Sequence, residues 1–324
     1  MIFILNPAPG VAQADDKKTD AMNSCRGNKV DPNRRIDACT WLLKSGQLAD
    51  KYYGLVHFSR AMAYGKNGQD ERAVRDFNKA IRLSPNQAAA YYNRALVYYK
   101  HRHYKQAIKD FGQAIGLKPN LAHLYYSRGQ AYKGIGEYDN AIQDYKEAIH
   151  LKEDYALAFK SRGESYQRKG EYDQAIRDFG EAVRLKPDDA LAIYHRGTVF
   201  GIKGLYDQAI QDLDKAILLN PNLAAAYDNR GNAYLMKGQH EQAILNYDQS
   251  LFLKPDNAGA YFNRGRAYGA KQQYDRAIRD FEKAIGISPN EEQFRRALEA
   301  VTKLKAKLYR TALIETHFED SQTV

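Results

Sequence analysis

The chain has 324 residues, of which 44% are hydrophobic and 27% charged. This mixture is typical of a folded protein and excludes disorder as the general state of the chain. No run of about 18 consecutive apolar residues occurs, so the sequence predicts no membrane-spanning helix. The formal net charge is +10 at pH 7, which favours attraction to polyanions, but no basic run reaches five residues.

The first predicted segment is residues 1–14, which begin with the apolar stretch MIFIL and end with AQA. A small-x-small tripeptide before a polar residue, here Asp15, is typical of a signal-peptidase site. The apolar part is short and has no positive flank, so the hypothesis is a truncated signal peptide whose true start lies upstream. A disordered N-terminus is the alternative interpretation.

Residues 15–53 contain the two cysteines of the chain, Cys25 and Cys39. An even count within one small segment favours a single disulfide in an oxidising compartment, and closing this loop would stabilise the fold by about 3 kcal/mol. Two free buried thiols are the alternative. Together with the export hypothesis, the pair predicts a periplasmic or extracellular protein, and a cytoplasmic protein remains the alternative. Asp31-Pro32 predicts the N-cap and first turn of a helix.

Residues 54–291 consist of seven copies of a 34-residue unit without an insertion. One column is Ala in every copy, a second is Tyr or Phe, and a third is Gly or Ala. A Pro column lies near the end of each copy, with Glu153 at the one point that lacks Pro. The copies are 54–87, 88–121, 122–155, 156–189, 190–223, 224–257 and 258–291.

Each copy predicts two helices. In the third copy, Tyr125, Gly129 and Tyr132 share one face of a first helix, and Ala141 and Ile142 begin the apolar face of a second. The Pro column follows the second helix, which it cannot extend. The small residues let the two helices approach closely, so a bulky residue there should cost several kcal/mol by overpacking.

The pattern Y-x-N-R-G-x-A-Y-x-x-x-G-x-Y-D-x-A-I-x-D-F-x-x-A-I-x-L-x-P resembles the tetratricopeptide repeat over residues 54–291. The resemblance implies an all-α, right-handed superhelical solenoid of antiparallel helix pairs, with the first helices on the concave side. It is specific for the fold and weak for the function. On the same grid, residues 20–53 resemble a degenerate repeat in which Cys25 and Cys39 lie in columns that pack together.

Residues 292–313 predict a capping helix over the open end of the repeat array. Its apolar stripe consists of Phe294, Ala297, Leu298, Val301, Leu304 and Leu308. Residues 314–324 are expected to form a flexible tail.

An arginine column and an aspartate column sixteen residues later run through the repeats. A phosphate-binding ladder is one interpretation, but we favour Arg–Asp pairs between helices because every copy would need them. In the sixth copy Arg230 has Asn246 at this distance, which predicts a less constrained arginine. The arginines are Arg60, Arg94, Arg128, Arg162, Arg196, Arg230 and Arg264.

The positions that vary between copies predict where a partner is recognised. On the concave face they are aromatic or apolar in the early copies and more polar in the late ones, which suits an extended peptide or an amphipathic helix. The alternative is that the rings pack on neighbouring helices. The predicted partner-binding residues are Phe58, Met62, Tyr92, Leu96, Tyr99, Tyr126, Lys160, Tyr194, Asn232 and Arg266.

One known function of the family is not expected. Chaperone-binding members hold a terminal carboxylate with Lys, Asn, Asn, Lys and Arg on the concave face. The best register offers Lys160, Glu164, His195, Ala225 and Asn229, of which only Lys160 matches.

The sequence therefore predicts a non-catalytic scaffold that binds a protein or peptide, with no cofactor, no metal and no catalytic residues. Similarity to exported bacterial repeat proteins implies a role in assembling envelope complexes. Nucleic-acid or polyanion binding through the basic surface is one alternative. A non-catalytic repeat subunit of an enzyme assembly is the other.

Overall fold

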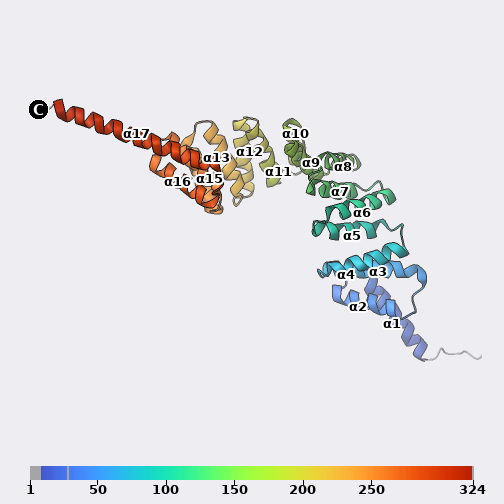
Figure 1. Ribbon diagram of the computed structural model, residues 1–324. Helices are drawn as coiled ribbons and strands as arrows, with labels where there is room; N and C mark the ends of the chain where they lie inside the picture. Colours follow the sequence, from blue (N-terminus) through green and yellow to red (C-terminus); the bar gives the residue numbers. More distant parts are fainter. Residues whose placement is uncertain (1–8, 28, 323–324) are drawn as a thin grey trace, which may run out of the picture. The chain divides into compact units, whose positions relative to one another are not determined.

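The computed structural model describes the backbone of residues 9–27 and 29–322, and the side chains of residues 16–27 and 29–310. All regular structure in this part of the chain is helical, and the expected all-α solenoid of tandem repeats is confirmed (Figure 1). The helices are α1 Pro9–Arg26, α2 Pro32–Lys44, α3 Asp50–Lys66, α4 Asp70–Leu83, α5 Ala88–Lys100, α6 Tyr104–Leu117, α7 Ala122–Gly134, α8 Tyr138–Leu151, α9 Ala156–Lys169, α10 Tyr172–Leu185, α11 Ala190–Ile202, α12 Tyr206–Leu219, α13 Ala224–Met236, α14 His240–Leu253, α15 Ala258–Ala270, α16 Tyr274–Ile287 and α17 Glu292–Gln322.

The chain divides into two compact units, with the boundary after Ser165 inside α9. In unit 1, α3 packs with α4, α5 with α6 and α7 with α8. In unit 2, α11 packs with α12, α13 with α14 and α15 with α16. Apart from the first turn of α3, which precedes residue 54, each of these pairs lies within one 34-residue copy, so the repeat is a two-helix unit in both parts of the chain.

Small residues allow the two helices of a repeat to touch. A Cβ added to Gly129 would lie 2.7 Å from the ring of Tyr145, and one added to Gly265 would lie 2.7 Å from the ring of Phe281. Carbon atoms do not approach this closely, so a ring can lie against the first helix only where that helix has no side chain. The predicted steric role of the Gly column is confirmed at these positions.

A left-handed residue ends the turn between the two helices of most repeats. Gly136 has φ +79° and Gly204 has φ +77°, which glycine adopts without a steric cost. At the same place in other copies, Arg102 has φ 59° and Gln272 has φ 60°. These two residues carry a Cβ in a conformation that L-residues disfavour.

The N-terminal helices α1 and α2 pack together and are joined by a disulfide between Cys25 and Cys39. Both cysteines are fully buried. The predicted cap is confirmed, because the Asp31 carboxylate accepts hydrogen bonds from the backbone N–H groups of Asn33 and Arg34. Residues 1–8 of the expected signal peptide lie outside the described residues, whereas the backbone from Pro9 belongs to α1.

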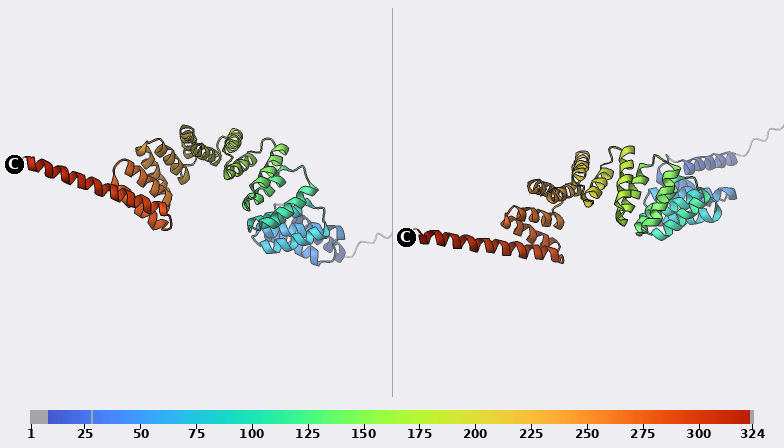
Figure 2. Two further views of the ribbon diagram at one scale, coloured as in Figure 1. Left: turned by 45° about the horizontal axis from the view of Figure 1, so that its top comes forward. Right: turned by 90° about the horizontal axis from the view of Figure 1, so that it is seen from above.

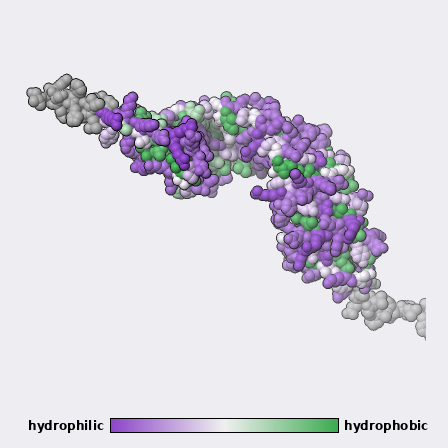
Figure 3. Space-filling model, in the orientation of Figure 1, coloured by the Kyte–Doolittle hydropathy of each residue, from purple (hydrophilic) through white to green (hydrophobic). Residues whose placement is uncertain are grey.

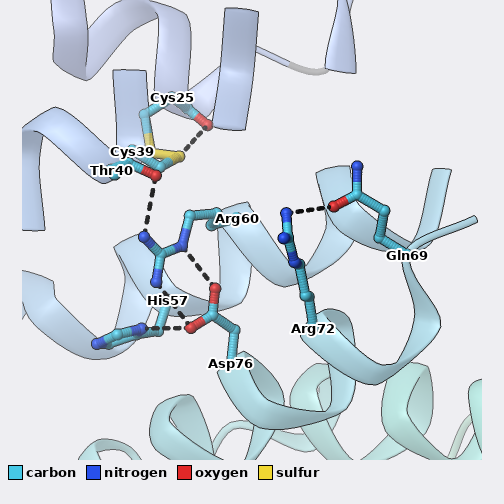
Figure 4. A network of polar contacts seen from close by, with 8 residues as sticks. All are labelled: Cys25, Cys39, Thr40, His57, Arg60, Gln69, Arg72 and Asp76. Atoms are coloured by element: carbon cyan, nitrogen blue, oxygen red, sulfur yellow. Dashed lines mark hydrogen bonds and ion pairs between the residues drawn. A yellow bond between two sulfur atoms is a disulfide. The ribbon is translucent and has the colours of Figure 1, made fainter. Parts of the chain in front are cut away.

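Polar contacts connect this N-terminal pair to the first full repeat (Figure 4). Thr40 on α2 accepts a hydrogen bond of 3.0 Å from Arg60 on α3. Arg60 and His57 both contact the Asp76 carboxylate on α4, at 2.6 and 2.9 Å. Burial by itself raises the pKa of Asp76, but these hydrogen bonds outweigh it and hold the pKa below its ordinary value. The disulfide-linked pair is therefore continuous with the repeats.

The last helix, α17, packs against α16 and extends beyond the other helices of unit 2 (Figure 2). Phe294 and Val301 are buried, as a capping helix requires. Leu304 and Leu308 are 46% and 45% exposed, so the later part of the apolar stripe is only partly covered. The backbone of α17 is helical as far as Gln322, and the flexibility expected for residues 314–324 stays a prediction.

Candidate functional site

The arginine column forms ion pairs between the two helices of a repeat. Within the two units the pairs are Arg60–Asp76, Arg94–Asp110, Arg128–Asp144, Arg196–Asp212 and Arg264–Asp280. The aspartates of these pairs are buried. These arginines are neutralised by carboxylates inside the fold, so they add little to any polyanion-binding surface.

The expectation of a less constrained Arg230 is wrong. Arg230 donates a hydrogen bond of 2.6 Å to Asn246 and another of 2.5 Å to Asp214 of the preceding repeat. Its guanidinium also lies 5.4 Å from the ring centre of Tyr227. The repeat pattern pairs each arginine with the residue sixteen positions later, whereas Arg230 also reaches a carboxylate sixteen positions earlier, across the repeat boundary.

We call the positions of the predicted partner-binding residues on the first helices of the repeats the first-helix face. In unit 1 its aromatic rings pack partly against second helices. The ring centre of Tyr92 lies 5.7 Å from that of Phe111, and the ring centre of Tyr126 lies 5.9 Å from that of Tyr145. Phe58 packs in the same way against Phe77, at 6.0 Å. Each ring is therefore partly used for packing inside the repeat, and only its exposed part can contact a partner.

Two predicted residues of unit 1 line a pocket of about 250 Å³ between α3 and α5. Met62 contributes from α3, and Leu96, which is 37% exposed, contributes from α5. Lys66 and Lys100 also line the pocket. It therefore joins an apolar wall to one ammonium group at the end of each of the two helices, and Asp70, which also lines the pocket, accepts a hydrogen bond of 2.6 Å from Lys100.

A phenol network joins α7 and α8 in the same unit. Tyr145 donates a hydrogen bond of 2.7 Å to Gln130, whose amide donates one of 2.8 Å to Tyr126. Burial, with the neighbouring Tyr104 and Tyr126, raises the pKa of Tyr99. The tyrosines of this network offer rings with polar edges, as interface tyrosines do.

The first-helix face of unit 2 is polar. Asn229 donates hydrogen bonds to Thr198 at 2.9 Å and to Tyr194 at 3.3 Å. Asn232 accepts from Asn263 at 2.9 Å and from Tyr247 at 2.8 Å. The predicted residues Tyr194 and Asn232 therefore belong to two separate hydrogen-bonded networks, one between α11 and α13 and the other joining α13 to α14 and α15.

A second pocket, of about 290 Å³, lies between α11 and α13 in unit 2. Asn229 and Asn232 form its polar wall, and Ile202, 51% exposed, and Met236, 58% exposed, form its apolar wall. Among the predicted residues of unit 2, Asn232 lines this pocket, whereas Tyr194 and Arg266 do not. Arg266 is exposed on α15 beside the Phe262 ring. Lys160 is partly buried on the part of α9 that belongs to unit 1.

Asp228 is one of the varying first-helix positions that make the late copies more polar, but it is not among the predicted partner-binding residues. It occupies the same repeat position as Tyr92, Tyr126 and Tyr194, but it carries a carboxylate. Burial raises its pKa to about 6, and a hydrogen bond from Asn257 opposes the rise. The signal was present in the sequence as a single acid in an otherwise aromatic or basic column.

The described residues contain no group of three or more His, Cys, Asp or Glu side chains that could hold a metal ion. No helix in the same part of the chain is both long and apolar enough to cross a membrane. The visible surface is mainly hydrophilic, with hydrophobic side chains in small separate patches (Figure 3).

Paired helices, close packing at small residues and variable first-helix positions define an all-α repeat protein of the protein-interaction type. The profile described as Tetratricopeptide repeat matches residues 88–121, 156–189 and 258–291. The profile described as TPR repeat matches residues 61–101, 134–170, 199–238 and 231–272. The chain belongs to the tetratricopeptide repeat family and is a protein-interaction scaffold of that family.

Solved structures agree with this assignment of the fold. A tetratricopeptide repeat protein from Parabacteroides merdae is 20% identical, with a TM-score of 0.58, covering 77% of this chain and 99% of that one. The C-terminal part of a TPR repeat-containing protein from Cytophaga hutchinsonii is also 20% identical, with a TM-score of 0.61, covering 74% and 99%. YrrB, described as a TPR protein with an unusual peptide-binding site, is 24% identical with a TM-score of 0.50, covering 57% and 95%. The comparison with curated proteins found no match.

Proposed function

We propose that this protein is a non-catalytic scaffold that binds a segment of a partner protein on its first-helix face. The observation that carries the proposal is the pocket between α3 and α5, which Met62, Phe77 and the 37% exposed Leu96 line. An apolar anchor in such a pocket, surrounded by aromatic side chains, is a common source of binding energy at protein interfaces. The peptide-binding site reported for YrrB, a protein of similar fold, supports the same reading.

The proposal extends to the compartment. The buried Cys25–Cys39 disulfide supports an exported protein, because disulfides persist in oxidising compartments such as the periplasm. A scaffold in such a compartment is suited to assembling envelope complexes, which is the specific role that we propose.

The experiment is a pull-down from native extract with the full chain and with Leu96→Glu as baits. A carboxylate in the pocket must be desolvated when an apolar anchor enters, so the variant should lose the partner. Leu83→Glu is the matched control, because Leu83 is 51% exposed on the second helix α4 of the same unit. Circular dichroism melting establishes that both variants remain folded.

A protein captured by the wild type and by Leu83→Glu, but not by Leu96→Glu, would establish the first-helix face and identify the partner. A partner that all three baits retain equally would contradict the proposal. Nucleic acid captured equally by all three, and released steeply as salt rises, would assign the function to the basic surface instead.

A further inference from the structure

Asp228 is a partly buried carboxylate with an unsatisfied oxygen in the middle of α13. Its Oδ1 atom is buried and has no hydrogen-bond partner in the described part of the chain. A buried acceptor without a partner destabilises the folded state, and does so more strongly when it is charged. The equivalent rings in unit 1 fill this position with apolar contacts, so the repeat fold itself does not require an acid here.

The surroundings of Asp228 supply no counter-charge. Asn257, the N-cap of α15, donates a hydrogen bond to the carboxylate but is neutral. Burial raises the pKa of the Tyr247 phenol on α14, and the nearby Asp228 carboxylate adds to this rise. Arg266 on α15 is the nearby cation, but it donates to Asn263 at 3.3 Å and lies over the Phe262 ring at 5.9 Å. The carboxylate is therefore complementary to a cation that none of its described neighbours provides.

The pocket between α11 and α13 lies next to this carboxylate along the same helix. Asp228, Asn232 and Met236 follow one another at four-residue intervals, so they lie on one side of α13. At 1.5 Å per residue, Asp228 and Met236 are about 12 Å apart along the axis. An extended peptide covers this distance in three or four residues of about 3.3 Å each.

We propose that the first-helix face of unit 2 recognises an extended protein segment with a basic and an apolar side chain three or four residues apart. The arginine or lysine pairs with Asp228, and the apolar side chain enters the pocket beside Ile202 and Met236. Asn229 and Asn232 lie between these two contacts. This inference rests on the proposed function, because it names the chemistry of a segment that the same face would hold.

The test uses the full chain and a synthetic peptide, Ser-Arg-Ala-Ser-Ala-Leu-Ser, acetylated and amidated at its ends. Its counterpart has neutral citrulline in place of arginine, and a second pair reverses the order of the residues. Dissociation constants come from amide chemical-shift titrations at pH 7.5. At least one arginine peptide should bind about tenfold more tightly than its citrulline counterpart, and Asp228→Asn should abolish that preference. Asp256→Asn is the control, since it removes the same charge from an exposed acid on the same unit.

Equal binding of arginine and citrulline peptides in both orders would overturn the inference. A preference for arginine that appears only in the Arg266→Gln variant would also overturn it, because Asp228 would then already be paired with Arg266 in the wild type. The Leu96→Glu variant separates the two proposals, since the pocket it changes lies in unit 1. It should keep the arginine preference whether or not it loses the native partner.

Discussion

Arg128 and Asp144 join the two helices of the third repeat through two parallel hydrogen bonds. Arg128 Nε donates to Asp144 Oδ2 at 2.9 Å, and Nη2 donates to Oδ1 at 2.7 Å. The hydrogen bond to Asp144 raises the pKa of the Arg128 guanidinium, and the Tyr125 ring lies 5.8 Å from it. Substitution of either residue would therefore leave the other without its ion-pair partner inside the repeat.

The first prediction follows from that pair. Asp144→Ala leaves the Arg128 guanidinium without its carboxylate, which should lower the free energy of unfolding by about 3 kcal/mol. The measurement is urea denaturation followed by circular dichroism. Asp154→Ala is the control, because that side chain is 77% exposed and 4.0 Å from its nearest ammonium group. Equal losses for the two variants would contradict an internal role for the column.

A second prediction concerns the turn at Arg102. Arg102→Gly should stabilise the fold by about 0.5–1 kcal/mol, because glycine adopts φ 59° without the Cβ clash. Arg102→Ala separates this effect from loss of the side chain, since alanine keeps the clash and should give no gain. Thermal melting of both variants measures the difference. A gain in the alanine variant as large as that in the glycine variant would show that backbone conformation is not the cause.

Close packing in α15 makes a third prediction with a control in the same helix. Gly265→Ala places a Cβ 2.7 Å from the Phe281 ring and should cost about 1–3 kcal/mol by overpacking. Gly269→Ala meets no atom within 4 Å and should be neutral or stabilising. Chemical denaturation should show a loss of stability in Gly265→Ala and none in Gly269→Ala, and equal destabilisation would contradict the steric account.

The fourth prediction is a pH dependence set by Asp228. Its folded-state pKa of about 6 lies above its ordinary value of 3.8, so the folded protein binds this proton more tightly than the unfolded chain does. The contribution to stability is therefore complete below pH 3.8 and is lost as the pH rises to about 6, by about 2–3 kcal/mol. Asp228→Asn should match the wild type at pH 4 and exceed it at pH 8. Parallel stability curves for the two proteins would show that Asp228 titrates normally.

The fifth prediction concerns the N-terminal disulfide. Replacing Cys25 and Cys39 together by Ala should destabilise the α1–α2 pair by about 3 kcal/mol, because the unfolded loop is no longer closed. Hydrogen exchange should quicken in α1 and α2, while α13–α16 in the other unit stay protected. Quickening of similar size in both units would mean that the disulfide stabilises the whole array.

The repeat period, the helix pairs and the Arg–Asp column could be predicted because they are repeated constraints. A structural requirement that occurs in every copy leaves the same residue type at the same spacing, as the Gly column facing Tyr145 and Phe281 shows. The candidate surface could be predicted only as a set of varying positions. Variation marks where the fold makes no demand, but it does not say how each side chain is used.

The sequence by itself determined the fold and the positions that a partner can reach, because helix periodicity and repeat spacing are local properties of the chain. Only the tertiary structure decided which of those side chains are already occupied. It showed that the rings of Tyr92 and Tyr126 pack against rings of second helices, and that Arg230 also donates a hydrogen bond to Asp214. It also showed that Asp228 Oδ1 is buried without a hydrogen-bond partner among the described residues. These facts depend on contacts between residues of different helices, and the sequence of a single repeat does not reveal contacts with the next repeat.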